Sequence, residues 1–222
     1  MHCRILKNQI MGKPGLTILK IIEIIAVYIG LPLLYWFDYI PLHKAIPLFL
    51  VFLVYLFILI NDKKFNRKIF WLNSFKNWTQ MFVRVMVFFL LSVTAVIIFM
   101  PENLFIIPRT NPLLFTLIFI FYPIWSAYPQ ELIYRAYFYH RFSSVFKNER
   151  LLIIINALLF SFSHMIFNNW IAIVLTFFGS LLFSYIYKKS NSLMVIFIEH
   201  ALYGNIIFTV GLGKYFYLPL NI

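Results

Sequence analysis

The stretch MFVRVMVFFLLSVTAVIIFM, residues 81–100, carries a single charged side chain, Arg84, in an otherwise largely apolar run. A helix needs roughly 20 apolar residues to cross the hydrocarbon core of a bilayer, which is about 30 Å thick. The chain supplies such runs repeatedly, at residues 17–36, 45–60, 81–100, 113–143, 151–167, 170–187 and 193–212. We therefore expect an all-α polytopic membrane bundle of about seven (six to eight) transmembrane helices, folded as a single transmembrane domain over residues 1–222.

The composition indicates the same class of protein. The chain is 63% hydrophobic and 12% charged, whereas soluble domains are roughly half apolar and a quarter charged. The lipid bilayer is thus the expected surrounding. The formal net charge of +12 does not indicate nucleic-acid binding, because the basic residues lie between apolar runs and form neither a tail nor a single face. Cys3 is the only cysteine, which excludes an intrachain disulfide or a thiolate zinc site.

Loop charges predict the orientation in the membrane. Clusters of lysine and arginine lie at residues 4–13, 63–68, 141–150 and 188–189. The connections that alternate with these clusters carry single basic residues, Lys44, Arg109 and Lys214. Because basic loops remain on the cytoplasmic side, we expect a multi-pass protein of the cell membrane with a cytoplasmic N-terminus.

The fourth span is too long for one simple crossing. Pro123 and Pro129 interrupt it, and proline removes a backbone donor and clashes with the preceding turn. The span could be a kinked helix, or an entering half joined to a second half that begins near Gln130.

Six ionisable side chains fall well inside the expected spans, where each is costly and needs a partner or a water-filled cavity. They are Arg84, Glu131, Arg135, His164, Glu199 and His200. From the helical rise, Glu131 lies about 18 Å, His164 about 20 Å and His200 about 10 to 15 Å from the cytoplasmic end of its span. Three titratable groups at similar depth on three helices predict one polar site inside the bundle.

These groups allow several interpretations. Glu131 and Arg135 are four residues apart and share a helix face, so they could form an ion pair that neutralises two buried charges. Each histidine could be a neutral imidazole bonded to a serine or a backbone carbonyl. Together the glutamate and the histidines could instead activate water by general base catalysis or hold a metal ion. We expect Arg84 to balance charge or to face an interface, and not to be catalytic. A proton-relaying transporter is a further alternative, disfavoured because the sequence shows no two related halves.

Three segments in chain order, QELIYR at 130–135, FSFSH at 160–164 and HALYGN at 200–205, resemble the motifs of the CPBP family. That family comprises CAAX prenyl proteases and bacteriocin-processing or abortive-infection proteins. Its pattern is a glutamate pair followed by x-x-x-Arg, then Phe-x-x-x-His, then a histidine with an asparagine or a small residue one helical turn later. The similarity covers residues 128–208, roughly, as the family-like catalytic core.

The resemblance implies an intramembrane endopeptidase that cuts a peptide or membrane-protein substrate. In such an enzyme a glutamate activates water, and histidines polarise the scissile carbonyl or stabilise its oxyanion. Carried over by position, the implied catalytic residues are Glu131, Arg135, His164, His200 and Asn205. The family is described both as metal-dependent and as glutamate-based, so His164 and His200 are also candidate ligands for zinc.

Two positions depart from the family pattern. Gln130 stands where the first glutamate is usual, and an amide cannot act as a general base. Asn205 lies one position after the usual asparagine, and Gly204 occupies that place as a small residue. Either Glu131 acts as the base after a small rotation of its helix, or the chain binds peptide without cutting it. The second case predicts a catalytically impaired membrane protein that acts in bacteriocin immunity or as a partner protein.

Overall fold

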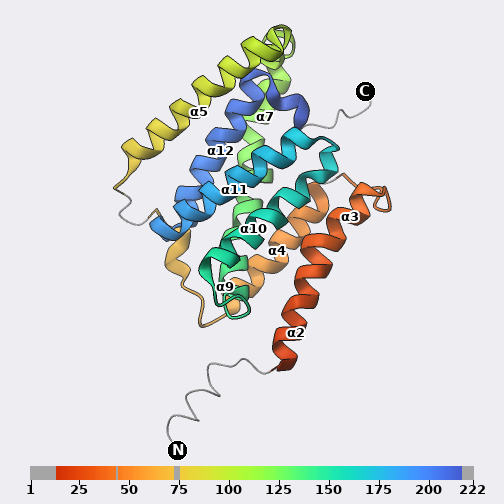
Figure 1. Ribbon diagram of the computed structural model, residues 1–222, viewed down its shortest axis with the longest axis vertical. Helices are drawn as coiled ribbons and strands as arrows, with labels where there is room; N and C mark the ends of the chain where they lie inside the picture. Colours follow the sequence, from red (N-terminus) through yellow and green to blue (C-terminus); the bar gives the residue numbers. More distant parts are fainter. Residues whose placement is uncertain (1–13, 44, 73–75, 217–222) are drawn as a thin grey trace, which may run out of the picture.

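The computed structural model describes residues 14–43, 45–72 and 76–216, which form a bundle of helices (Figure 1). The α-helices are α2 (Pro14–Glu23), α3 (Leu31–Trp36), α4 (Ala45–Asn61), α5 (Trp78–Phe99), α6 (Ile106–Thr110), α7 (Pro112–Tyr122), α8 (Tyr128–Glu131), α9 (Phe138–Phe142), α10 (Glu149–Ser163), α11 (Trp170–Ser190) and α12 (Leu193–Val210). Wider π-helical turns occupy Ile24–Gly30, Pro123–Ala127 and Leu132–Tyr137. Short 3-10 turns occupy Arg67–Phe70, Pro101–Asn103, His164–Phe167 and Leu212–Tyr215. Cys3, the basic cluster of residues 4–13 and Lys44 lie outside the described residues.

Within the described residues, the helices form seven apolar segments. Six are long and apolar enough to cross a membrane: Gly15–Trp36, Trp78–Phe99, Pro112–Phe142, Glu149–Phe167, Trp170–Ser190 and Leu193–Val210. The seventh, α4, is a shorter apolar helix of 17 residues. The described part of the chain contains no strand. These findings confirm the predicted all-α polytopic bundle, and the chain is a multi-pass membrane protein.

The fourth span is one unbroken helix of 31 residues, Pro112–Phe142. Its two prolines do not divide it, so the alternative of two separate halves is wrong. A π-helical turn begins at Pro123, and a second begins soon after Pro129, at Leu132. A proline leaves the carbonyl four residues earlier without its donor, and a widened turn relieves the clash while the helix continues.

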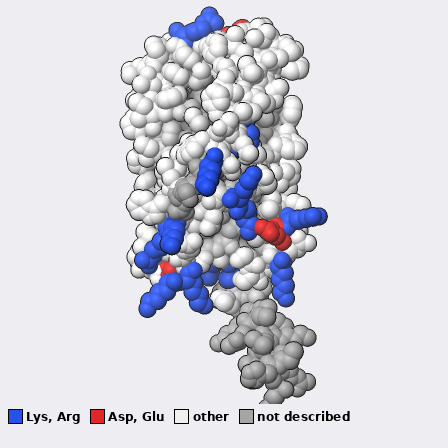
Figure 2. Space-filling view, turned by 90° about the vertical axis from the view of Figure 1, so that its left-hand side faces the viewer, with Lys and Arg blue, Asp and Glu red and all other residues white. Residues whose placement is uncertain are grey.

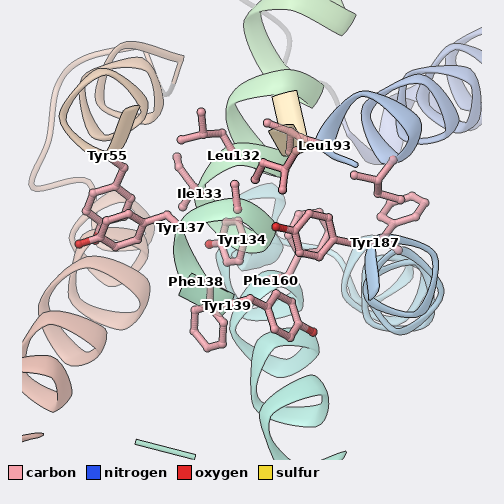
Figure 3. Packing of buried hydrophobic residues seen from close by; sticks show 14 of the residues in the cluster. Tyr55, Leu132, Ile133, Tyr134, Tyr137, Phe138, Tyr139, Phe160, Tyr187 and Leu193 are labelled. Atoms are coloured by element: carbon pink, nitrogen blue, oxygen red, sulfur yellow. The ribbon is translucent and has the colours of Figure 1, made fainter. Parts of the chain in front are cut away.

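The second half of this long helix forms the centre of the bundle. Every residue of the π-helical turn Leu132–Tyr137 is buried, whereas α7, in the first half, has no buried residue. Figure 3 shows Tyr134, Tyr137 and Phe138 surrounded by side chains of the neighbouring helices. The rings of Tyr137 and Tyr55 stack with centroids 3.5 Å apart, which joins the long helix to α4. The buried half therefore gives Glu131 and Arg135 a rigid support.

Polar contacts join the basic connections at one end of the bundle. These contacts are Arg141 Nε to Glu23 Oε2 at 3.0 Å, His140 Nε2 to Asp62 Oδ2 at 2.7 Å, Lys188 Nζ to Glu149 Oε1 at 2.9 Å and Ser192 Oγ to the Trp71 carbonyl at 2.7 Å. Figure 2 shows lysine and arginine gathered in the lower half of the visible face, toward the end where α2 begins. The three basic clusters that the structure describes thus share one end of the molecule.

Candidate active site

A cavity of about 1140 Å³ lies within the bundle and is lined mainly by apolar side chains. Its polar wall includes Arg84, Tyr122, Gln130, His164, His200 and Tyr203. No aspartate or glutamate of the described ranges 14–43, 45–72 and 76–216 is among the lining residues. Polar groups in a concave apolar site are the usual arrangement for ligand binding. The polar groups at this wall come from different helices. We therefore take the polar wall of the cavity as the candidate site.

Glu131 and His200 are in direct contact. Glu131 ends α8 and is fully buried, while His200 lies on α12 and borders the cavity. The Nδ1 atom of His200 lies 2.7 Å from Oε1 of Glu131. An ionised carboxylate only accepts hydrogen bonds, so Nδ1 carries the proton and donates it. In the neutral ring Nε2 is therefore the basic nitrogen.

Arg135 contacts the Glu131 carboxylate oxygen that His200 does not contact. Its Nε lies 3.3 Å from Glu131 Oε2, so the ion pair expected from their spacing is present. Its Nη2 donates to the hydroxyl of Ser180, at 3.1 Å, and its guanidinium carbon lies 4.8 Å and 5.6 Å from the ring centroids of Phe160 and Phe183. Because both charged groups have zero exposure, the arginine balances the carboxylate away from water and holds it toward His200.

His164 lies at the end of α10, where the helix tightens into a 3-10 turn. Its Nδ1 lies 2.8 Å from the carbonyl oxygen of Phe160 and 3.3 Å from Oγ of Ser163. A carbonyl only accepts, so Nδ1 again carries the proton and Nε2 is the basic nitrogen of the neutral ring. The Phe160 ring centroid lies 4.7 Å from that of His164 and 6.0 Å from that of His200. Both imidazoles thus pack against Phe160 and border one cavity.

Gln130, and not Glu131, lines the cavity. The Nε2 of Gln130 donates to Oγ of Ser126 at 2.8 Å, whereas its Oε1 is buried with no hydrogen-bond partner. Consecutive residues of a helix diverge by about 100°, so the two side chains face different directions. Turning Glu131 toward the cavity would break its contacts with both His200 and Arg135.

Asn205 lies away from the cavity wall. Its Nδ2 donates to the Phe119 carbonyl at 3.3 Å, and its buried Oδ1 has no hydrogen-bond partner. Gly204 borders the cavity instead, against the ring of Tyr122. The structure therefore brings Glu131, Arg135, His164 and His200 together and leaves Asn205 outside this group.

A second polar cluster lies beside the first. Arg84 on α5 donates from Nε and Nη2 to the two carboxylate oxygens of Glu199 at 2.7 and 2.8 Å, and the Tyr203 hydroxyl donates to Glu199 Oε1 at 3.1 Å. Arg84 thus balances a buried carboxylate, as expected. Tyr122, Ser126 and Tyr203 were missed from the sequence. Aromatic residues make up 21% of the chain, so a single tyrosine carries no signal there.

The described residues at the cavity wall do not supply a zinc site. Across residues 14–43, 45–72 and 76–216, no group of three or more histidine, cysteine, aspartate or glutamate side chains is arranged to hold a metal ion. A catalytic zinc usually has three protein ligands, and the Glu131 carboxylate is already engaged by Arg135 and His200. The donors at this wall therefore do not fit a zinc ion.

The chain was compared with known protein families, curated proteins and solved structures. No curated protein and no solved structure matches it. A family model does match, over residues 111–206, a range that includes all three motifs. This model is described as type II CAAX prenyl endopeptidase Rce1-like. The motif-bearing segment of the chain is thus similar to the CAAX prenyl endopeptidases, consistent with the CPBP family.

Proposed function

We propose that this protein is an intramembrane endopeptidase of the CPBP type, which hydrolyses a peptide bond in a peptide or membrane-protein substrate. The observation that carries the proposal is the contact of 2.7 Å between Glu131 Oε1 and His200 Nδ1, at the wall of the cavity. A carboxylate that holds a histidine in one tautomer leaves its second nitrogen available as a general base. The family match supports the same class of reaction.

The reaction can be derived from this arrangement. Nε2 of His200 accepts a proton from water as the water oxygen attacks the scissile carbonyl carbon, and the Glu131 carboxylate stabilises the resulting imidazolium. The tetrahedral intermediate collapses when its carbon–nitrogen bond breaks. His200 then returns the proton to the leaving nitrogen, which gives one carboxylic acid and one amine. Glu131 acts through His200, and so it is a positioning residue here. His164, on the same wall, has a second basic nitrogen that can orient the water.

Cleavage by the purified full chain tests this proposal. The protein in detergent is incubated with a peptide library, as wild type and as His200→Gln and His140→Gln. His140 lies at the basic end, paired with Asp62, and does not border the cavity. We expect His200→Gln to abolish cleavage and His140→Gln to retain it. If the folded wild-type protein cuts no peptide, or if His200→Gln cuts as fast as wild type, the proposal is wrong.

Gln130 favours a second candidate function, a catalytically impaired protein of the same fold that acts in bacteriocin immunity or as a partner of another protein. The specific observation is that the cavity wall carries an amide where the family has its first glutamate. This candidate predicts no cleavage by wild type and gain of cleavage by Gln130→Glu, with Gln130→Asn as the matched control. Wild-type activity that Gln130→Glu does not increase would exclude it.

We also propose that the N-terminus faces the cytoplasm of the cell. The clustering of the basic connections at one end supports this orientation, through the preference of lysine and arginine for cytoplasmic loops. Single cysteines at Lys147 and Arg109, in a Cys3→Ser background, can be labelled in intact cells with a maleimide that does not cross membranes. We expect labelling of Arg109→Cys, and labelling of Lys147→Cys only after permeabilisation. The reverse pattern would overturn the orientation.

A further inference from the structure

Tyr122 lies against Gly204, where its ring leaves no room for a side chain unless the ring shifts. It ends α7, immediately before Pro123, and its ring crosses α12 at Gly204. A Cβ atom added to Gly204 would overlap the Cε1, Cζ and hydroxyl oxygen atoms of Tyr122. The ring centroid lies 5.5 Å from that of Phe208. The absence of a side chain at Gly204 thus lets the phenol lie directly on the helix backbone.

This phenol shares the cavity wall with His200. Both residues border the cavity, and their ring centroids are 6.3 Å apart at an interplanar angle of 71°. A small polar group placed between them could contact both side chains. Within the described part of the chain, the Tyr122 hydroxyl makes no hydrogen bond. It is therefore available to a ligand.

The proposed reaction needs a hydrogen-bond donor for the carbonyl oxygen of the substrate, and the two neutral histidines do not provide one. Since Nδ1 carries the proton in both neutral rings, each Nε2 accepts hydrogen bonds and cannot stabilise a negative oxygen. Two other hydroxyl donors at the wall are already engaged, that of Tyr203 with Glu199 and that of Ser163 with the Phe160 carbonyl. Hydrolysis of a peptide bond develops negative charge on the carbonyl oxygen, and a preorganised donor at that point is a large contribution to catalysis.

We infer that Tyr122 is a catalytic residue whose hydroxyl donates a hydrogen bond to the scissile carbonyl oxygen of the substrate. This inference rests on the proposed peptidase function and adds the oxyanion donor to it. The carbonyl lies between Tyr122 and His200, so that the water held by His200 attacks its carbon while the phenol stabilises its oxygen. No covalent bond to Tyr122 forms, and its proton stays on the phenol.

Tyr122→Phe tests the inference, because it removes the hydroxyl and keeps the ring that packs on Gly204. We expect kcat to fall by about 100-fold, as for loss of one oxyanion donor, with KM changed by less than about threefold. A tetrahedral phosphinic peptide with the sequence of a cleaved substrate should bind correspondingly weaker, while the uncleaved peptide binds as before. Tyr139→Phe is the matched control: Tyr139 is buried but does not border the cavity.

The outcomes separate the inference from the function on which it rests. If wild type cuts nothing, the peptidase proposal fails, and a phosphinic peptide based on the best-bound library member still decides the role of Tyr122. Weaker binding of that peptide to Tyr122→Phe alone would support a donor at this position. The inference would be overturned if wild type and Tyr122→Phe bind the phosphinic peptide equally, if they have equal kcat, or if neither protein binds the peptide.

Discussion

The guanidinium of Arg84 donates two hydrogen bonds to the Glu199 carboxylate, Nε to Oε1 at 2.7 Å and Nη2 to Oε2 at 2.8 Å. These bonds connect α5 to α12. The carboxylate has no exposure, whereas the arginine side chain is 27% exposed. Such paired geometry is the strongest form of arginine–carboxylate contact. The pair fixes the position of a helix that also forms part of the cavity wall.

Arg84→Met should destabilise the protein strongly, because it leaves the Glu199 charge buried and unpaired. The expected loss is about 3 to 5 kcal/mol in the free energy of unfolding, measured by denaturation in detergent micelles. In the double variant Arg84→Met/Glu199→Gln most of that loss should be recovered, since no buried charge remains. Equal stability of the single and double variants would contradict this explanation.

Glu131→Gln should lower kcat by about a thousandfold or more, because an amide no longer stabilises the imidazolium of His200. KM should change little, since Glu131 does not border the cavity. Glu131→Asp should recover part of kcat, which a purely structural role would not predict. Steady-state kinetics on one cleaved peptide provides both constants. A rise in KM with unchanged kcat in Glu131→Gln would show that the residue acts on substrate binding instead.

Gly204→Ala should cost about 1 to 3 kcal/mol of stability through overpacking against Tyr122. The cost should shrink when Tyr122→Ala is added, because the two groups that collide are then both small. Gly179→Ala is the control within α11, where an added Cβ would lie 3.8 Å from the Phe183 ring, an ordinary contact. Equal losses at the two glycines would contradict the close packing of Tyr122.

The Asp62–His140 pair predicts a pH dependence at the basic end. The hydrogen bond from His140, with a smaller contribution from the Lys64 backbone, lowers the pKa of Asp62 from its ordinary value of 3.8. A lowered pKa means that the stabilisation is present above the ordinary value and is lost as pH falls through the lowered one. Asp62→Asn should therefore lower Tm at pH 7 and have no effect near pH 2. A difference that stays constant with pH would exclude this cause.

The position of each ionisable side chain along its own helix was predictable from the sequence, but the direction of the side chain was not. The positions of His164 and Glu131 along their helices depend only on a fixed rise per residue, which needs no knowledge of neighbouring helices. Which of Gln130 and Glu131 faces the cavity depends on rotation about the helix axis. The π-helical turns Pro123–Ala127 and Leu132–Tyr137 lie on either side of these residues. Each turn changes the rotation of the residues after it, so a regular 3.6-residue period gives the wrong face.

The contacts between helices could not be predicted from the sequence either. The pairs Arg84–Glu199 and Tyr122–Gly204 join residues far apart in the chain. Nothing in the local pattern selects these partners, because many apolar helices could pack in several orders around the same centre. The family resemblance located the three motifs but gave no information on Tyr122, which lies outside them.

The unequal lengths of neighbouring helices have a consequence for the surrounding lipid. At the usual rise, the 17 residues of α4 span about 25 Å, while the 31 residues of Pro112–Phe142 extend for about 46 Å. These two elements pack side by side. The hydrocarbon layer must therefore thin around α4, or the longer helix must tilt. Short-chain lipids should therefore suit this protein better than long-chain ones, and acyl-chain length becomes a variable in reconstituting it.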